Sequence, residues 1–330
     1  QDKGYVFDII SSDFSGDSKE VFNSLKSSGS RLFCNGRISI LTIILFFRCL
    51  ANNRYHHVEL YSAGKLGFIY ALILRMFRYR FLVIERGDIG CIADYPILVR
   101  FSMLLAYRLA SGVIYKEIYM KPLLENLGVK KLHFLPNCAV SISSDHVLPI
   151  NKRVGFLWVN RIIPQRRAAW LLRSFSSDEL ASSCLNMLGF RSLADKRSDS
   201  HDIEIELLHL QGKNRHLHLR KEPFDFYEKS CFFCLASELV FGNNALLEAM
   251  SYGMVPIVTK TPGVELIVED GVNGIVTEMN EHDYHQGLVE ASKLDARRVQ
   301  EMSDAVINTI RRKFSPESWA DNLDLIYRMC

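Results

Sequence analysis

Short apolar runs of about four to six residues alternate with longer amphipathic stretches along nearly the whole chain. This alternation is typical of parallel β-sheets covered on both faces by helices, because each parallel strand is joined to the next by a helical crossover. The sequence therefore predicts an α/β fold.

The alternation runs in two series, separated by a polar segment at residues 137–145 that ends near Pro149. A chain of 330 residues also exceeds what one hydrophobic core usually supports. We therefore predict two domains, residues 1–150 and 151–330. Strands are expected at residues 6–10, 31–34, 58–61, 81–85, 112–115 and 132–135, and then at 155–159, 185–188, 217–219, 231–235, 255–258 and 274–276.

Helices are expected between these strands, at residues 18–27, 38–50, 66–77 and 97–110 of the first series among others. The tail at residues 316–327 also reads as a helix, with Ser315 as its cap and Pro316 at its first position.

Eight cysteines lack the dense, even spacing of a disulfide framework, which favours a reducing compartment and a cytoplasmic protein. Cys231 and Cys234 lie within an apolar run and are predicted to be buried strand residues, not half of a zinc site. No apolar run reaches the ~20 residues that span a membrane. No basic stretch has a spacing that indicates nucleic-acid binding.

Residues 1–150 hold 18 Lys and Arg against 12 Asp and Glu, so the first half is basic, while the remainder holds 22 against 25. Basic and aromatic residues interleave at residues 75–81. This segment favours either peripheral contact with an anionic membrane or a solvated helix end that runs into a core strand.

Two arginines, Arg161 and Arg166, follow the first strand of the second series. In open parallel sheets, ligands bind beyond the carboxyl ends of strands. Guanidinium groups at such a turn, near a helix N-terminus, suit a diphosphate, although basic helix starts are also often merely solvated.

A second polar loop, Ser237 to Asn244, follows the apolar run that ends at Leu235. Asn243 or Asn244 is expected to cap a helix from Ala245, with its free amides directed outward. Glu248 then lies about one turn into that helix, where its carboxylate can accept hydrogen bonds from a vicinal diol such as that of ribose.

These segments resemble the donor-binding signature of family 4 glycosyltransferases. The resemblance covers residues 237–258, with Leu-Glu-Ala-Met and Val-Pro-Ile-Val, and residues 159–166, similar to Gly-Arg-Leu-x-x-x-Lys with Arg166 in place of lysine. Residues 261–274, 135–140 and 314–327 resemble further family segments, and the similarity is thin before residue 100.

The resemblance implies a GT-B fold of two Rossmann-like domains facing an interdomain cleft, with the acceptor on the first domain, the donor on the second, and the final helix, 316–330, packed back on the first. It implies that Arg161 and Arg166 bind the donor diphosphate and that Glu248 holds the ribose. The loop and helix start would contact the sugar and phosphates through Phe241, Gly242, Asn243, Asn244 and Ala245.

Two positions depart from the family pattern. Val240 stands where the family carries a glutamate beside the transferred sugar, and Glu238, two residues upstream, is the alternative carboxylate. In the first domain no histidine stands near residues 85–89, so Asp88, or Glu85 or Arg86, is the candidate near the reacting bond; Asp88 is equally a candidate helix cap.

Other polar features receive ordinary interpretations. Gly16 either lets the backbone approach the phosphates or forms a simple turn. His216 and His218 are predicted to be structural, residues 202–206 to form a half-exposed strand, and no metal site is expected.

The resemblance implies a retaining, metal-independent hexosyltransferase that needs no cofactor and uses a nucleotide diphosphate sugar as donor. The expected acceptor is a glycan or lipid-linked molecule, in bacterial surface polysaccharide synthesis, with the enzyme cytoplasmic and in contact with the membrane. The alternatives are a catalytically silent GT-B protein that binds a nucleotide sugar or a partner, and a nucleotide-sugar epimerase of the same fold.

Overall fold

The computed structural model describes residues 8–11, 31–34, 40–61, 64, 66–139, 147–190, 205–219, 222–238 and 240–330. By its internal contacts the chain divides into two compact units. The first comprises residues 1–115, 120–134 and 323–330, and the second comprises residues 116–119 and 135–322. The sequence placed the boundary at residue 150, whereas the contacts place it after Phe134.

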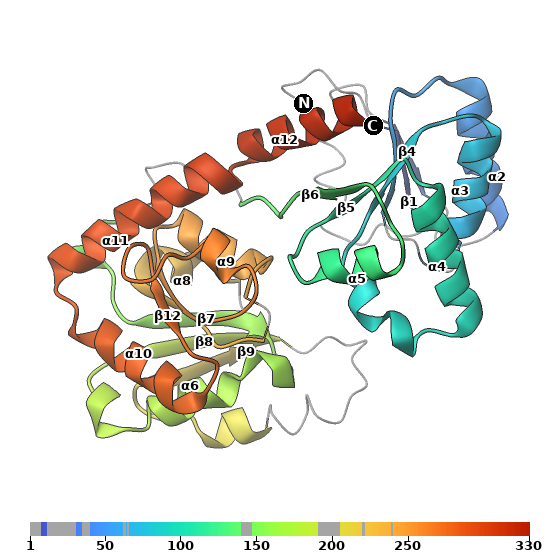
Figure 1. Ribbon diagram of the computed structural model, residues 1–330. Coiled ribbons are helices and arrows are strands. Elements are labelled where there is room, and N and C mark those ends of the chain that lie inside the picture. Colours follow the sequence, from blue (N-terminus) through green and yellow to red (C-terminus); the bar gives the residue numbers. More distant parts are fainter. Residues whose placement is uncertain are drawn as a thin grey trace. The chain divides into compact units, whose positions relative to one another are not determined.

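The first unit contains a parallel sheet in the order β3-β4-β5-β6 and a separate parallel pair, β1-β2 (Figure 1). Its strands are β1 (Asp8–Ser11), β2 (Arg31–Cys34), β3 (Val58–Tyr61), β4 (Phe81–Ile84), β5 (Gly112–Tyr115) and β6 (Leu132–Phe134). Its helical elements are α2 (Ile40–Asn52), α3 (Gly67–Met76), η1 (Asp88–Asp94), α4 (Ile97–Leu109) and α5 (Met120–Asn126). These bounds confirm the predicted strands and the predicted helices at residues 38–50, 66–77 and 97–110 to within two residues. The predicted helix at residues 18–27 and the first two residues of the predicted strand 6–10 lie outside the described residues.

Helices α3 and α4 bury faces that follow the helical period. Ala71 and Leu74 are fully buried on α3, and Met103 and Ala106 are buried on α4. Strands β4 and β5 are buried along their whole lengths, as expected for a parallel sheet covered on both faces. Burial of these apolar side chains is the main force that holds this layer together.

The final helix, α12 (Pro316–Met329), begins with the predicted cap, because the Ser318 amide donates to Ser315 Oγ at 3.1 Å. Its last residues belong to the first unit. There Tyr327 donates from its hydroxyl to Glu59 Oε1 at 2.7 Å and stacks on His57 with ring centroids 4.3 Å apart.

The second unit contains a six-stranded parallel sheet in the order β12-β11-β10-β7-β8-β9. Its strands are β7 (Phe156–Arg161), β8 (Leu185–Phe190), β9 (Arg215–Leu219), β10 (Phe232–Leu235), β11 (Val255–Thr259) and β12 (Ile275–Thr277). Its longer helices are α6 (Ala168–Ser174), α8 (Phe224–Lys229), α9 (Asn244–Ser251), α10 (Glu281–Lys293) and α11 (Ala296–Thr309). Short turns complete it: η3 (Ile150–Lys152), η4 (Pro164–Arg166), η5 (Asp178–Leu180), η6 (Val264–Leu266) and the π-helical η7 (Ile310–Phe314). Counted in chain order within the unit, this is the 3-2-1-4-5-6 order of a Rossmann fold.

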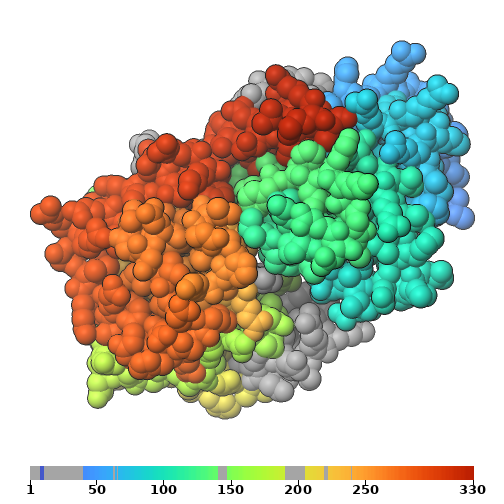
Figure 2. Space-filling view, in the orientation of Figure 1, coloured from blue at the N-terminus to red at the C-terminus, as the bar shows by residue number. Residues whose placement is uncertain are grey.

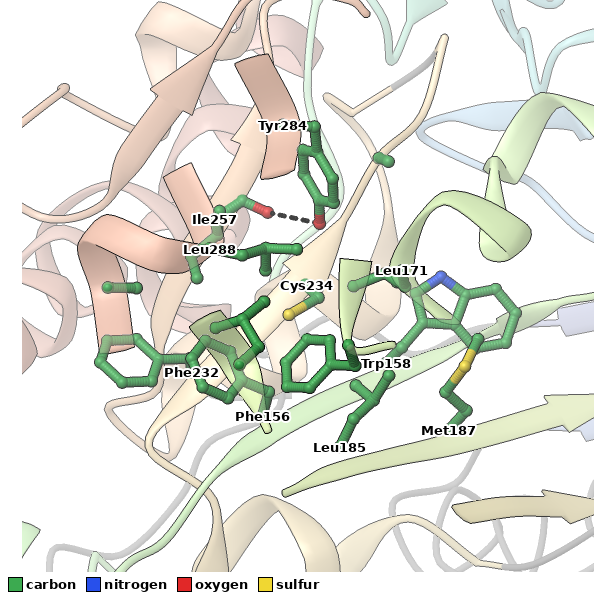
Figure 3. Close-up of a cluster of buried hydrophobic side chains, with 14 of the residues drawn as sticks. Phe156, Trp158, Leu171, Leu185, Met187, Phe232, Cys234, Ile257, Tyr284 and Leu288 are labelled. Carbon is green, nitrogen blue, oxygen red and sulfur yellow. Dashed lines mark hydrogen bonds between the residues drawn. The ribbon is translucent and has the colours of Figure 1, made fainter. Parts of the chain in front are cut away.

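Large apolar side chains from the strands and from α6 and α10 form the core of the second unit (Figure 3). Trp158 and Leu185 are fully buried, as is Tyr284, whose hydroxyl donates to the Ile257 carbonyl oxygen at 3.4 Å. Cys231 and Cys234 are buried, as predicted; Cys234 lies in β10, whereas Cys231 directly precedes the strand.

In Figure 2 the orange to orange-red part of the chain, which contains α9, α10 and α11, lies on the visible face of the second unit. Helix α10 contacts β11 and β12, and α11 contacts β11. Among the described residues, no helix is long and apolar enough to cross a membrane.

The strand prediction for residues 202–206 is wrong over its described part, because residues 205–209 are helical. Leu207 is fully buried in the core and Leu210, three residues later, packs against it. That spacing is helical, and the polar-apolar alternation over five residues was too short to exclude it. Residues 202–204 lie outside the described residues.

Candidate functional site

The carboxyl ends of β7 and β10 mark the point where the strand order of the second sheet reverses. These two strands are hydrogen-bonded neighbours although two strands lie between them in the chain. In doubly wound sheets the loops that follow two such strands run in opposite directions, and ligands bind in the crevice between them. Both sequence-predicted donor segments, around Arg161 and Ser237, leave the sheet at this point.

Arg161 and Arg166 lie on the loop after β7. Arg161 ends the strand with an exposed side chain, and Arg166 ends the turn η4. Arg166 Nη1 donates to Ser237 Oγ at 2.7 Å, which joins this loop to the one after β10. Burial lowers the pKa of the Arg166 guanidinium, Arg161 lowers it further, and Glu117 opposes both. Two repelling cations at a partly buried site favour the binding of an anion.

Two amide side chains that the sequence analysis did not select lie at the end of β7 and on the loop after it. Asn160 is 8% exposed, and its Nδ2 has no hydrogen-bond partner among the described residues; the same holds for Gln165 Oε1. Buried polar atoms are nearly always paired in folded proteins. These atoms are therefore available to a ligand of this crevice.

The loop after β10 is held in place from both sides. Ser237 is fully buried; its amide donates to Thr259 Oγ1 at 2.9 Å, and that hydroxyl donates back to the Ser237 carbonyl at 2.7 Å. Val240 is also fully buried. Its side chain packs inside the unit, so position 240 offers the crevice no polar group.

Asn243 caps α9 as predicted, because its Oδ1 accepts from the Leu246 amide at 3.2 Å. Gly242 makes the turn before the cap. Its φ of +79° is a backbone conformation that residues with a side chain rarely adopt. Asn244 and Ala245 form the first turn of the helix, whose free amides carry partial positive charge.

Asn137, in the segment that begins the second unit, supports this turn. Its Nδ2 donates to the Gly242 carbonyl at 3.1 Å and to Asn244 Oδ1 at 2.8 Å, and Lys116 Nζ donates to Asn137 Oδ1 at 2.9 Å. Asn137 lies in the segment 135–140 that resembles a family segment. Its contacts with Gly242 and Asn244 join residues over 100 positions apart, so no local sequence pattern reveals them.

Glu248 lies in α9, half-buried, where its Oε2 accepts from the Tyr227 hydroxyl at 3.0 Å. Tyr227 is fully buried on α8 and stacks on Tyr252 with ring centroids 5.5 Å apart. Burial raises the pKa of the Glu248 carboxyl, and the Tyr227 bond opposes the rise. The tyrosine fixes Oε2 of the carboxylate, and no hydrogen bond of Oε1 is found among the described residues.

The two proposed catalytic carboxylates have local partners of their own. Glu238 is exposed and forms an ion pair with Arg167. Asp88 begins η1 in the first unit and accepts from the Tyr95 hydroxyl at 3.2 Å. Their catalytic roles stay predictions. Phe241 is 4% exposed, so its side chain is not accessible to a ligand, and the predicted contact through its backbone stays a prediction.

Glu85 has a structural function at the end of β4. It is fully buried, and its Oε1 accepts from the amides of Gly87 at 2.8 Å and Ile89 at 3.0 Å, while Oε2 accepts from the Tyr107 hydroxyl. A carboxylate so fully bonded closes the turn before Asp88. Gly16 lies outside the described residues.

In the part of the chain that is described, no group of three or more His, Cys, Asp or Glu side chains converges. His216 and His218 lie on β9 as expected, with His218 Nε2 3.1 Å from Asn186 Oδ1.

Glu117 is a candidate residue that the sequence analysis missed. It belongs to the second unit, beside Gly242, where a Cβ on the glycine would come within 2.8 Å of Glu117 Cγ. Burial raises the pKa of its carboxyl from 4.5 to about 7, although Arg166 and Lys116 oppose the rise. A carboxyl group that titrates near neutral pH beside Arg166 is able to respond to an anionic ligand.

This pKa predicts a pH-dependent stability. Because the folded-state pKa of Glu117 lies above its unfolded value, its contribution is most favourable below pH 4.5 and is lost as the pH rises through about 7. Glu117→Gln is therefore expected to gain thermal stability relative to the wild type between pH 5 and pH 8. Calorimetric Tm values for both proteins across this range, with exposed Glu125→Gln as control, measure the gain; a difference that does not change with pH contradicts it.

The family comparison matches a part of the chain that lies within the second unit. Residues 153–293 match the family model for glycosyl transferases group 1. They contain β7, the crevice loops and α9. No match was found among curated protein sequences.

Solved structures match the chain over nearly its full length. Sucrose-phosphate synthase from Thermosynechococcus elongatus is 12% identical, with a TM-score of 0.68 and 98% of each chain covered. HepE of Anabaena, in complex with UDP and glucose, is 14% identical, with a TM-score of 0.72 over 96% of this chain and 90% of that one. A glycosyltransferase from Rickettsia africae is 14% identical, with a TM-score of 0.71 over 99% and 90%. The fold is GT-B. At these identities the GT-B likeness establishes the architecture, and the chemistry has to be argued from the crevice.

Proposed function

We propose that this chain is a glycosyltransferase resembling family 4, which moves a sugar, with retention of anomeric configuration, from a nucleotide diphosphate sugar to a glycan or lipid-linked acceptor. The observation that carries the proposal is the crevice at the strand reversal, where Arg161 and Arg166 lie on one loop and Glu248 on the helix after the other. Diphosphate and ribose are the two parts common to all such donors.

Charge explains the chemistry that this arrangement supports. As the glycosidic bond breaks, positive charge develops on the sugar and negative charge on the departing diphosphate. The Arg166 guanidinium, held by Ser237, and the α9 amides are in place before the reaction, and together with Arg161 they stabilise that negative charge electrostatically. In this proposal no divalent metal ion is needed, and no cofactor takes part.

The acceptor side of the proposal rests on the first unit. Helix α4 begins with three exposed apolar side chains, Ile97, Leu98 and Phe101, which are 78%, 78% and 58% exposed. Exposed apolar side chains in a basic domain suit a lipid-linked acceptor and peripheral contact with an anionic membrane. Synthesis of a bacterial surface polysaccharide, on the cytoplasmic side, is the proposed setting.

Incubation with a panel of nucleotide diphosphate sugars tests the proposal, beginning with UDP-glucose because HepE is known in complex with it. We expect slow hydrolysis or transfer of one donor, unchanged by excess chelator. Activity that is lost in chelator and restored only by a divalent metal contradicts metal independence.

A catalytically silent nucleotide-sugar-binding protein is the second candidate. Buried Val240 and ion-paired Glu238 favour it, because neither supplies a free carboxylate near the sugar. Saturable donor binding without hydrolysis or transfer to any glycan or lipid-linked acceptor identifies that case.

A further inference from the structure

A cavity of about 540 Å³ lies within the first unit, at the amino ends of its parallel strands. Arg80 precedes β4, Gly112 begins β5 and Lys131 precedes β6. The backbone joins these strand starts, since the Ser111 amide donates to the Phe81 carbonyl at 2.8 Å and the Val113 amide to the Lys131 carbonyl at 2.9 Å. The cavity is therefore a feature of the sheet edge, not of a single loop.

The charged side chains that line this cavity are all cations: Arg75, Arg80, Arg108, Lys130 and Lys131. None of the five forms an ion pair with a described carboxylate. The remaining lining residues are Tyr107, Ala110, Ser111, Gly112, Gly128, Val129, Met329 and Cys330. Like charges gathered in a concave site focus a positive potential on it.

Favourable interaction with helix C-termini explains only two of the five basic residues. Arg75 lies in the last turn of α3 and Arg108 in the last turn of α4, where a cation offsets the partial negative charge of the helix end. Arg80, Lys130 and Lys131 lie outside those helices. Arg80 Nη1 donates to the Cys330 backbone oxygen at 3.1 Å.

The charge of Lys131 acts on His133, which does not line the cavity itself but lies against two residues that do, Gly112 and Cys330. His133 packs against Gly112, and its Nε2 lies 3.3 Å from Cys330 Sγ. Burial lowers the pKa of His133, and Lys131 lowers it further. A bound anion would offset Lys131 and raise this pKa, so His133 is a built-in reporter of occupancy.

We propose that this cavity is a second ligand site, which binds a phosphate-bearing anion. Arginine forks and lysine ammonium groups are the side chains that proteins use for phosphate oxygens, and the volume suits a small ligand or a headgroup. The strands separate it by about 10–13 Å from the carboxyl edge of the sheet, where Asp88 lies. The site is distinct from the donor crevice and does not depend on the proposed transferase activity.

Inorganic pyrophosphate is the probe for this site, and the ring signals of His133, followed by NMR in histidine-labelled protein, are the readout. We expect saturable shifts of His133 and a raised pKa in the wild type. In the double variant Arg80→Gln/Lys131→Gln the affinity should fall by about tenfold or more. The matched control Arg100→Gln/Lys121→Gln removes the same charge elsewhere in the unit and should bind as the wild type does.

Vesicles distinguish the two sources of phosphate. The protein is sedimented with vesicles that contain phosphatidylglycerol and, for comparison, with vesicles of phosphatidylcholine alone. Sedimentation that requires phosphatidylglycerol, is lost in the double variant and is kept in the control assigns a lipid headgroup as the ligand. A His133 response to pyrophosphate without vesicle binding assigns a soluble phosphate. If the wild type gives neither response, or the double variant gives both undiminished, the proposal is wrong. Pyrophosphate bound only in the donor crevice leaves His133 unchanged and counts against it.

Discussion

Replacing Arg166 by alanine is expected to reduce kcat/KM for the donor by about 10²- to 10³-fold, the range seen when one preorganised donor to a developing negative charge is removed. Arg166 is partly buried, and its bond to Ser237 links it to the loop after β10. The loss should therefore appear in kcat as well as in KM, because the diphosphate gains charge as the bond breaks.

Two further variants show whether Arg166 acts through its position. Arg166→Lys keeps the charge but not the planar fork, and should give a loss between those of the wild type and the alanine variant. Arg173→Gln removes a guanidinium that already bonds Glu281 and Glu206, and should leave the kinetics unchanged. Equal activity in Arg166→Ala and Arg173→Gln would exclude Arg166 from the donor site.

Replacing Glu248 by alanine is expected to weaken donor binding by about 10- to 100-fold, as for the loss of one or two hydrogen bonds to a charged group. The variant should raise KM and leave kcat nearly unchanged, because the ribose keeps its contacts from the ground state to the transition state. With the wild type, a donor that carries 2′-deoxyribose should bind more weakly than the ribose donor by a similar factor. With Glu248→Ala, the deoxy donor should bind almost as well as the ribose donor does. Additive losses from the variant and the deoxy donor would show that Glu248 does not contact the 2′-hydroxyl.

Tyr227→Phe separates contact from positioning at Glu248. The variant removes the 3.0 Å bond to Glu248 Oε2 and leaves the carboxylate in place. We expect a smaller rise in KM than for Glu248→Ala, and no additional effect when the two changes are combined. A loss of activity in Tyr227→Phe that exceeds that of Glu248→Ala would assign the tyrosine a role beyond positioning.

The elements of the fold were accessible from the sequence, since buried parallel strands leave apolar runs and capped helices leave Asn or Ser at their starts. Strands β3 and β5 have the predicted bounds, and Asn243 and Ser315 cap the predicted helices. The strand order is a different matter, because pairing between β7 and β10 joins residues about 75 positions apart and leaves no local signal.

The places of Arg161 and Arg166 after a strand and of Glu248 in the following helix were predictable from the sequence, while their roles in donor binding stay predictions. The contribution of a residue that acts through burial or distant partners was not predictable. Glu117 owes its altered pKa to packing beside Gly242, and Asn160 is notable only because it is buried without a partner. Val240 was recognised as a departure, and its complete burial shows that it belongs to the core of the loop.

A thermal-shift titration with nucleotide diphosphate sugars tests the central claim most directly, because a ligand that binds only the folded state raises Tm. At a concentration 100-fold above Kd the stabilisation is about 2.7 kcal/mol, which corresponds to a shift of several degrees. We predict such a shift for at least one donor with the wild type and with Arg173→Gln, and its loss with Arg166→Ala and Glu248→Ala. The absence of a shift for every donor, or a shift that both of those variants retain in full, would contradict a donor site in this crevice.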